Sequence, residues 1–324
     1  MNFASILIDW QKESGRHGLP WQGSNDPYRV WVSEIMLQQT QVATVIPYYE
    51  KFLSVFPDIQ KLAEAGLDEV LSLWSGLGYY SRARNLHKTA KLIRKNGKFP
   101  ENPEDLAMLP GIGRSTAAAI CAFSFGTRAA ILDGNVKRVF SRHFGMEGYP
   151  GDKMVEDRMW EQAESLLPEN EVGRYTQALM DLGATLCTRR NPDCMHCPLS
   201  GSCIARYEGR VDELPYARPK KALPCRRTAF LLMERDGRLL FERRPEKGVW
   251  AGLLCFPEAD PSEFSESEKL FSFAHTFTHF RLEIEAVRIQ GNREGIWLAI
   301  EEALSSPIPV PVRKILEKIR SPSL

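Results

Sequence analysis

Residues 109–139 constrain the fold of this chain more than any other stretch. Gly111 and Gly113 lie two residues apart at the start of a helical pattern, where a tight turn can direct free backbone N–H groups outward. Such a turn can bind a phosphate, although an ordinary structural turn has the same spacing. The run of residues 114–125 is small and apolar, and it stops before Gly126. This predicts a buried helix with a glycine C-cap.

Asp133 stands directly before the next helical pattern. We expect it to cap that helix, and the positive end of the helix dipole would then keep the carboxylate ionised. Residues 109–113 followed by Asp133 resemble the helix-hairpin-helix DNA glycosylase superfamily. The resemblance implies that Asp133 faces the sugar of an extruded nucleotide, and that Gly111, Gly113 and Ser115 bind DNA.

Length and composition favour a globular protein with two domains, since 324 residues with 43% hydrophobic content can bury a large core. The net charge of +1 gives no support to nucleic-acid binding. No apolar run has the length of a membrane helix and residues 1–11 lack a signal-peptide pattern, so we expect no membrane association and a cytoplasmic location.

One segment is locally basic. Residues 81–100 contain seven cations and no acidic residue, which makes this segment a candidate phosphate-facing surface; a solvated helix face is the alternative. The cations are Arg82, Arg84, Lys88, Lys91, Arg94, Lys95 and Lys98.

Glu34 lies on an unusually apolar helix face. We expect one helix over residues 28–42, in which Val30 and Trp31 lie one turn before Glu34 and Leu37 one turn after it. Apolar surroundings raise the pKa of a carboxyl group, which is what a general acid near neutral pH requires. A glutamate paired with a nearby arginine or lysine is the alternative.

Two segments resemble the adenine DNA glycosylase (MutY) family. Residues 33–42, Ser-Glu-Ile-Met-Leu-Gln-Gln-Thr-Gln-Val, resemble its catalytic helix. The resemblance implies that Glu34 is the proton donor and that Gln39 enters the base stack. Residues 77–86 resemble a second motif of the family, which implies that Tyr79 wedges beside the damaged base, and Arg82 is a further candidate DNA contact.

Four of the seven cysteines lie within one short loop with the spacing C-x6-C-x2-C-x5-C: Cys187, Cys194, Cys197 and Cys203. We expect a metal site and not disulfides, because the chain shows no secretory signal. Structural zinc is the main alternative, but zinc ribbons usually carry two C-x2-C pairs and this loop has one. The spacing is similar to that of the cluster loop in the endonuclease III and MutY branch, which implies one [4Fe-4S] cluster per chain.

After the polar residues 208–224 the pattern changes to strands, with a predicted β-hairpin that turns at Asp236 and Gly237. Residues 248–257 resemble the Nudix-like C-terminal domain of the MutY family, but the acidic Nudix box is missing. We therefore expect this domain to recognise a ligand without hydrolysing it. Phe277, Thr278 and His279 resemble the family loop that probes 8-oxoguanine, with Thr278 in place of a serine.

The predicted architecture is multidomain. Residues 1–207 are expected to form an all-α helix-hairpin-helix glycosylase domain that includes the iron–sulfur loop at 187–203. Residues 208–224 form a linker, and residues 225–324 form an α+β Nudix-like lesion-recognition domain.

The implied activity is that of a monofunctional DNA glycosylase in base excision repair, a monomer acting on double-stranded DNA in the bacterial nucleoid. Its substrate would be adenine opposite 8-oxoguanine or G. One alternative is a bifunctional oxidised-pyrimidine glycosylase and AP lyase of the endonuclease III type, but Ser115 stands where that enzyme has its lysine nucleophile. Another is a non-catalytic iron–sulfur DNA-binding protein, for which Glu34 and Asp133 would both be unnecessary.

Overall fold

The computed structural model describes residues 2–218, 222–265, 268–291 and 293–320. The chain divides into two compact units. The first consists of Met1–Glu64 and Asn85–Pro219, and the second of Ala65–Arg84 and Lys220–Leu324. None of the helices in these described ranges is long and apolar enough to cross a membrane.

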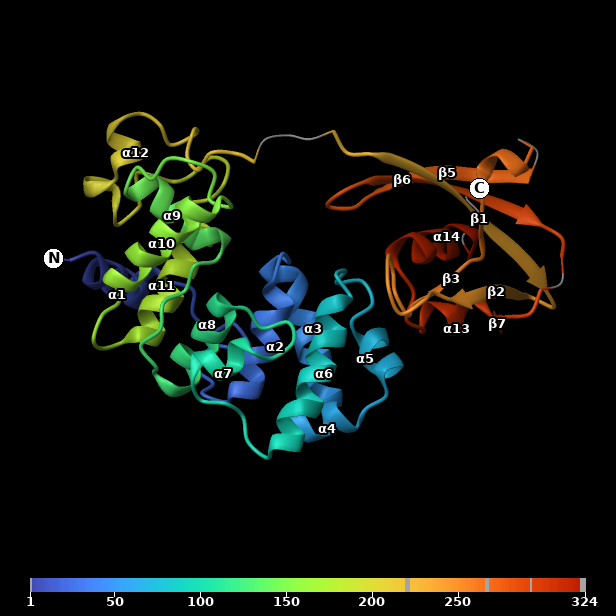
Figure 1. Cartoon of the computed structure of the whole chain (residues 1–324), viewed down its shortest axis with the longest axis horizontal. Coiled ribbons are helices and arrows are strands. Elements are labelled where there is room, and N and C mark those ends of the chain that lie inside the picture. The colour runs from blue at the N-terminus through green and yellow to red at the C-terminus, as the bar shows by residue number, and fades with distance from the viewer. Residues whose placement is uncertain (1, 219–221, 266–267, 292, 321–324) are drawn as a thin grey trace. The chain divides into compact units, whose positions relative to one another are not determined.

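The first unit is helical throughout its described part, and its helices can be followed in Figure 1. Helix α6 begins in the second unit and continues into the first. The helices are α1 (Phe3–Ser14), α2 (Pro27–Leu37), α3 (Val42–Val55), α4 (Ile59–Glu64), α6 (Ser81–Asn96), α7 (Pro103–Ala107), α8 (Arg114–Phe125), α9 (Gly134–His143), α10 (Lys153–Ser165), α11 (Val172–Thr185) and α12 (Ile204–Tyr207).

Helix α8 follows its sequence signals closely. Gly113 is its N-cap, and Gly126 ends it in the left-handed conformation with φ 68°, as predicted. Gly111 has φ 81°, and a Cβ there would lie 2.7 Å from the Cβ of Asn85. Glycine is therefore required at position 111 by both backbone conformation and space.

Helix α2 is shorter than expected, and the prediction of one helix over residues 28–42 is therefore wrong. The helix ends at Leu37 and a new helix, α3, begins at Val42. Gln38 leaves the helical conformation with ψ 110°, and Gln39 is left-handed with φ 58°. This break turns the chain and leaves the Gln39 side chain exposed.

The core of the first unit joins helices that are distant in sequence. Leu7 of α1, Phe140 of α9 and Leu182 of α11 are fully buried in one apolar cluster, to which the small side chains of α8 also contribute. Burying such side chains stabilises the fold by about 1.5–3 kcal/mol each. This packing holds the N-terminal ends of α8 and α9 in place.

The described residues of the second unit form a seven-stranded mixed sheet with the order β3-β2-β1-β6-β5, in which β4 also pairs with β1 and β7 with β2. Figure 1 shows the long strands β1, β5 and β6 together with the helices α13 and α14. The elements are β1 (Cys225–Arg235), β2 (Arg238–Arg243), β3 (Leu254–Cys255), β4 (Glu258–Ala259), β5 (Lys269–Thr276), β6 (Arg281–Ile289), β7 (Ile296–Leu298), α13 (Ile300–Leu304), α14 (Val310–Arg320) and, from the earlier segment, α5 (Leu67–Leu73).

The predicted hairpin is confirmed. Strands β1 and β2 are antiparallel, and Asp236 and Gly237 both have positive φ, 51° and 71°, as a two-residue turn of this type requires. Strands β1 and β6 are parallel, so they are joined by a long excursion of the chain. Apolar side chains of α14, such as Ile315, pack with Phe230 and Phe241 against one face of the sheet.

Candidate active site and cluster loop

A cleft of about 1620 Å³ opens in the first unit. Its walls come from α2, α11 and the N-terminal ends of α8 and α9, which are the ends that the core holds in place. Glu34 from α2 and Asp133 from the start of α9 both line it. The fold therefore brings two carboxylates that are far apart in sequence to one cavity.

Glu34 has the environment expected of a proton donor. Burial and, to a lesser extent, the negative charge of Asp133 together raise its pKa from 4.5 to about 8. Its neighbours on α2 are buried apolar side chains, including Trp31 and Ile35. No arginine or lysine pairs with Glu34 in the described part of the chain, so the ion-paired alternative has no support. The carboxyl group is protonated at neutral pH.

Asp133 caps α9, as predicted. Its carboxylate accepts hydrogen bonds from the backbone N–H groups of Asn135, at 3.0 Å, and Val136, at 2.8 Å. Burial, the largest effect, raises the pKa of Asp133, while these hydrogen bonds and the charge of Arg138 lower it.

The two carboxyl groups differ in their support for negative charge. Asp133 accepts two N–H bonds and lies near two cations, whereas Glu34 has neither form of support. Negative charge is therefore better supported on Asp133, and that charge contributes to the raised pKa of Glu34. One neutral acid and one carboxylate in the same cleft is the combination used for general-acid chemistry at a glycosidic bond.

Arg138 ties the start of α9 to its surroundings. Its guanidinium donates to the backbone oxygen of Cys187 at 2.7 Å and to that of Gly183 at 2.6 Å. It also donates to the side-chain oxygen of Asn135 at 2.8 Å. The segment that carries Asp133 is thereby fixed to α11 and to the loop that begins at Cys187.

The four loop cysteines are free thiols. Burial raises the pKa of Cys194, Cys197 and Cys203, and charge on neighbouring cysteines raises each further, so the thiols lie close enough to act on one another. The described residues contain no group of three or more His, Cys, Asp or Glu side chains arranged for a single metal ion.

Arg142 binds the loop that carries these cysteines. It is buried and donates to the backbone oxygen of Thr188 at 2.7 Å, and one of its nitrogens lies 3.5 Å from the sulfur of Cys187. The thiol of Cys203 lies 3.5 Å from the backbone oxygen of Arg142. A positive group among thiols favours their ionised, metal-binding form.

The residues of the glycine hairpin divide by role. Gly113 has φ −92°, and a Cβ there would meet nothing within 4 Å, so nothing in the described chain requires glycine at this position. Ser115 lines the cleft, and its hydroxyl accepts a hydrogen bond from the N–H of Leu132 at 3.0 Å. Ser115 thus supports the backbone just before Asp133.

Gln39 and Tyr79 share an uncommon feature. Both have a positive φ, 58° and 49°, and both side chains are exposed. Backbone in this conformation is costly for residues other than glycine and is often retained at functional sites. Each residue therefore projects from its own turn into solvent.

Arg82 is buried, whereas a side chain that contacts a DNA phosphate would be exposed. Only 8% of the residue is exposed, and its guanidinium lies over the rings of Trp74 and Tyr79, at 5.4 and 5.5 Å. It also donates to the backbone oxygens of Leu77 and Gly78 at 3.3 Å. The exposed cations of the basic segment are Lys88, Lys91, Arg94, Lys95 and Lys98.

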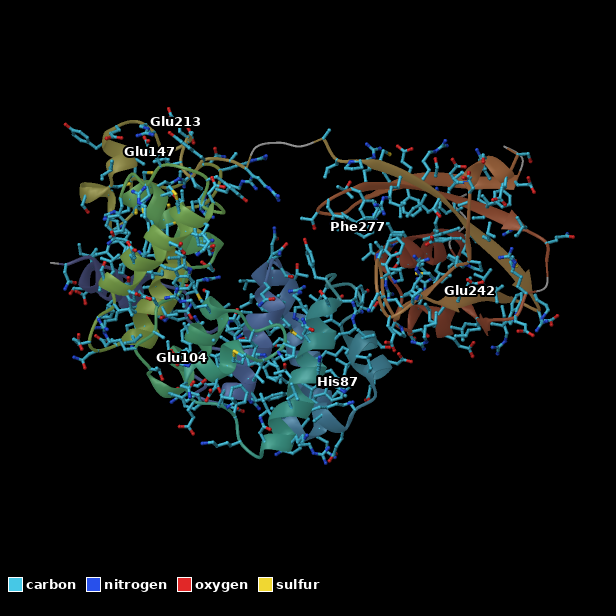
Figure 2. The ribbon with its side chains drawn as sticks, in the orientation of Figure 1. His87, Glu104, Glu147, Glu213, Glu242 and Phe277 are labelled. Atoms are coloured by element: carbon cyan, nitrogen blue, oxygen red, sulfur yellow. The ribbon has the colours of Figure 1, made fainter. Side chains whose placement is uncertain are left out.

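The tip of the β5–β6 hairpin carries Phe277, which is labelled in Figure 2. Thr278 and His279 follow it in the same turn. The ring of Phe277 stacks on that of Phe280 with centroids 4.4 Å apart, and its N–H donates to the backbone oxygen of Phe280 at 2.8 Å. Thr278 and His279 are exposed. A rigid aromatic base thus presents two polar side chains to solvent.

Known protein families match both the helical part and the part that contains the sheet. The family model described as HhH-GPD superfamily base excision DNA repair protein matches residues 32–165, and a NUDIX domain model matches residues 228–318. The adenine DNA glycosylase of Buchnera aphidicola subsp. Acyrthosiphon pisum is 38% identical, over 98% of this chain and 97% of that protein. This chain belongs to the adenine DNA glycosylase family. The adenine DNA glycosylase of Homo sapiens is 31% identical, over 97% of this chain and 73% of that protein.

Solved structures support the helical part. A thermostable thymine-DNA glycosylase has a TM-score of 0.58 and 30% identity, and the match covers 64% of this chain and 95% of that chain. Endonuclease III in a non-covalent DNA complex has a TM-score of 0.54 and 22% identity, covering 64% of this chain and 94% of that chain, and shows the same fold. The predicted fold class, a helix-hairpin-helix domain followed by a Nudix-like domain, is confirmed.

The predicted iron–sulfur loop is also matched. A model for the iron-sulfur binding domain of endonuclease III covers residues 187–203, so the loop is an iron–sulfur binding motif. The donor set fits this group: four free thiols share one loop beside a buried guanidinium. In a cluster each thiolate binds a different iron atom, so its ligands need not converge on one point as those of a single ion must.

The sequence analysis did not single out Arg16 and Gln177, which line the cleft, or Asp181, which bonds to both. Gln177 lies on α11, and Asp181, one turn further, is completely buried. Asp181 accepts hydrogen bonds from Gln177 and from Arg16, whose backbone and side chain contact it at 2.9 and 2.7 Å. The sequence pattern gave no clear signal for Asp181, because polar residues, Gln177 and Thr185, lie one turn to either side of it.

Proposed function

We propose that this protein is a monofunctional DNA glycosylase that removes adenine mispaired with 8-oxoguanine, or with G, in base excision repair. The observation that carries the proposal is the pair Glu34 and Asp133, which line one cleft and differ in their support for negative charge. The family relationship indicates that adenine is the base that is removed.

The proposed mechanism gives the two carboxyl groups different roles. The adenine leaves the base stack at a cost of a few kcal/mol, which is smaller for a mismatched base. Glu34, neutral at pH 7, donates its proton to the departing base, since adenine is a poor leaving group. Asp133, held by two N–H bonds, stabilises the positive charge that develops on the sugar.

Duplex DNA is the proposed partner, bound by a monomer. The open space around Gly113 lets a phosphate approach the N–H groups at the start of α8 closely. Gln39 and Tyr79, each on a strained and exposed turn, are proposed to occupy the gap left by the extruded base. Gly111 shapes the hairpin, and Arg82 supports the Tyr79 turn from beneath.

The proposed cofactor is one 4Fe–4S cluster held by Cys187, Cys194, Cys197 and Cys203. When bound, it cross-links the loop and takes no part in base removal. Arg142 holds the loop backbone, and the exposed Arg189 is a candidate contact for DNA.

The assignment as a glycosylase without lyase activity rests on Ser115. A lyase needs an amine nucleophile, whereas the Ser115 hydroxyl is engaged with the N–H of Leu132. Lys137, four residues after Asp133, pairs with Glu156 at 2.6 Å. Both observations favour hydrolysis of the glycosidic bond without strand cleavage.

The proposed lesion reader is the domain at residues 225–324, joined through the linker at 208–224 to the glycosylase domain at 1–207. Phe277 stacked on Phe280 forms a fixed platform, and the exposed Thr278 and His279 supply hydrogen-bonding groups toward 8-oxoguanine. Threonine keeps the hydroxyl of the serine found in the family loop.

One assay tests the proposal. Single-turnover reactions on duplexes with A opposite 8-oxoguanine, A opposite G, and thymine glycol separate an adenine glycosylase from an oxidised-pyrimidine enzyme and from a binding protein. We expect adenine release from the first two duplexes, fastest from the first, and no strand cleavage before alkali. Release of thymine glycol with strand cleavage, or binding without release, would refute the proposal.

A further inference from the structure

The turn that carries Tyr79 belongs structurally to the unit of the sheet. Residues 65–84 precede that unit in the sequence by more than a hundred residues, yet they cluster with it. The hydroxyl of Tyr80 is buried and donates to the backbone oxygen of Ile308 at 2.8 Å. Arg243 forms a two-bond ion pair with Asp68, at 2.9 and 2.7 Å.

A continuous set of contacts joins this turn to the tip of the β5–β6 hairpin. We name residues 77–80 the wedge turn and residues 277–280 the lesion loop. The ring of Phe277 lies 5.4 Å from that of Trp250. The next residue, Ala251, accepts a hydrogen bond through its backbone oxygen from Arg84 at 2.7 Å.

Arg84 completes the connection at the other end. Its backbone N–H donates to the oxygen of Tyr80 at 3.1 Å in the first turn of α6, directly after the wedge turn. Its guanidinium is partly desolvated, and burial lowers its pKa. A charged donor that reaches a buried carbonyl is among the stronger hydrogen bonds, and losing it leaves that carbonyl without this partner.

We propose that Arg84 is a positioning residue that couples the lesion loop to the wedge turn through Trp250 and Ala251. This rests on the proposed function, in which Tyr79 enters the stack and the lesion loop contacts 8-oxoguanine. Docking of the loop on the lesion then fixes Tyr79 for insertion, so extrusion of adenine is favoured where the opposite base is oxidised. A separate phosphate contact by the same guanidinium is the competing role.

Arg84→Gln tests the coupling, with Lys88→Gln as the matched control. Lys88 is an exposed cation one turn further along the same helix, so both changes remove one positive charge. The readout is the ratio of single-turnover rates for A opposite 8-oxoguanine and A opposite G. We expect Arg84→Gln to lower the ratio about tenfold through the first duplex alone, the factor for a difference of about 1.4 kcal/mol. The control should leave the ratio unchanged.

A double-mutant cycle separates coupling from two independent effects. Phe277→Ala should lower the ratio in the wild-type background and lower it much less when Arg84→Gln is already present. Tyr80→Phe, which removes the hydroxyl that bonds to Ile308, provides a second variant without charge change and should lower the ratio about threefold. If Arg84→Gln does not fold, the ratio measured for Tyr80→Phe tests the coupling in its place.

Three results would overturn the proposal. An unchanged ratio in Arg84→Gln, or in Tyr80→Phe when only that variant folds, removes the coupling. If the double mutant lowers the ratio by the product of the two single-mutant factors, Phe277 and Arg84 act independently. An equal loss on both duplexes with a weaker salt dependence assigns Arg84 to a phosphate. If the wild-type protein releases no adenine, the proposed function fails first, and the coupling fails with it.

Discussion

Replacing Glu34 with glutamine should stabilise the protein while abolishing its chemistry. The pKa of Glu34 is raised from 4.5 to about 8 by burial and by Asp133. Because the folded pKa lies above the unfolded one, the stability contributed by the neutral carboxyl is fully present below pH 4.5 and is lost as the pH rises through about 8. Glutamine is neutral at every pH, so the variant keeps that stability.

The size of the effect follows from the shift. One pKa unit corresponds to about 1.36 kcal/mol, so the shift from 4.5 makes wild-type protein less stable than the variant by about 3 kcal/mol at pH 7. For a domain of this size, that raises the melting temperature of Glu34→Gln by about 6–12 °C. Near pH 4 both side chains are neutral, and the difference should nearly vanish.

The assay combines thermal melting from pH 4.5 to 8.5 with single-turnover adenine release. Glu13→Gln, at an exposed glutamate of α1, controls for the loss of one carboxylate. Adenine release by Glu34→Gln should fall by about 10²–10⁴-fold, and the wild-type rate should decline as the pH rises through about 8. Equal melting temperatures for wild type and Glu34→Gln at pH 5 and at pH 8 would refute the burial argument. A wild-type rate that stays flat to pH 9.5 would refute Glu34 as the acid.

Three further outcomes are expected. Asp133→Asn should reduce single-turnover adenine release as severely as loss of the acid, since it removes the anion beside the sugar; near wild-type rates would leave only a capping role. Gly113→Ala should keep the melting temperature but weaken duplex binding, whereas Gly111→Ala should destabilise the fold by about 1–3 kcal/mol, because its Cβ would meet Asn85 at 2.7 Å; equal behaviour of the two variants in denaturant titration and binding would contradict this division. Metal analysis of anaerobically purified protein should find four irons per chain, and one zinc without iron would exclude the cluster.

Much of this molecule is determined locally, and the sequence was sufficient there. Gly126 ends α8 and Asp133 caps α9 because a left-handed glycine and a short carboxylate satisfy free helix ends within a few residues. Asp236 and Gly237 likewise specify the hairpin locally, because both adopt the positive φ that its two-residue turn requires. The cysteine spacing identified the iron–sulfur loop, since those ligands also lie within one short segment.

Contacts between distant segments decided the rest. Nothing near Glu34 in the sequence indicates Asp133 as its neighbour, and the burial that raises the pKa of both carboxyl groups depends on packing from several helices. The helix predicted over residues 28–42 ends at Leu37, where Gln38 leaves the helical conformation and Gln39 takes a positive φ, a break that the local helical pattern does not indicate. Residues 65–84 joined the unit of the sheet through hydrogen bonds such as that of Arg84, which no periodicity in the sequence encodes. Local patterns set the elements and their caps, whereas burial, charge and the pairing of distant residues arise only when the chain is packed.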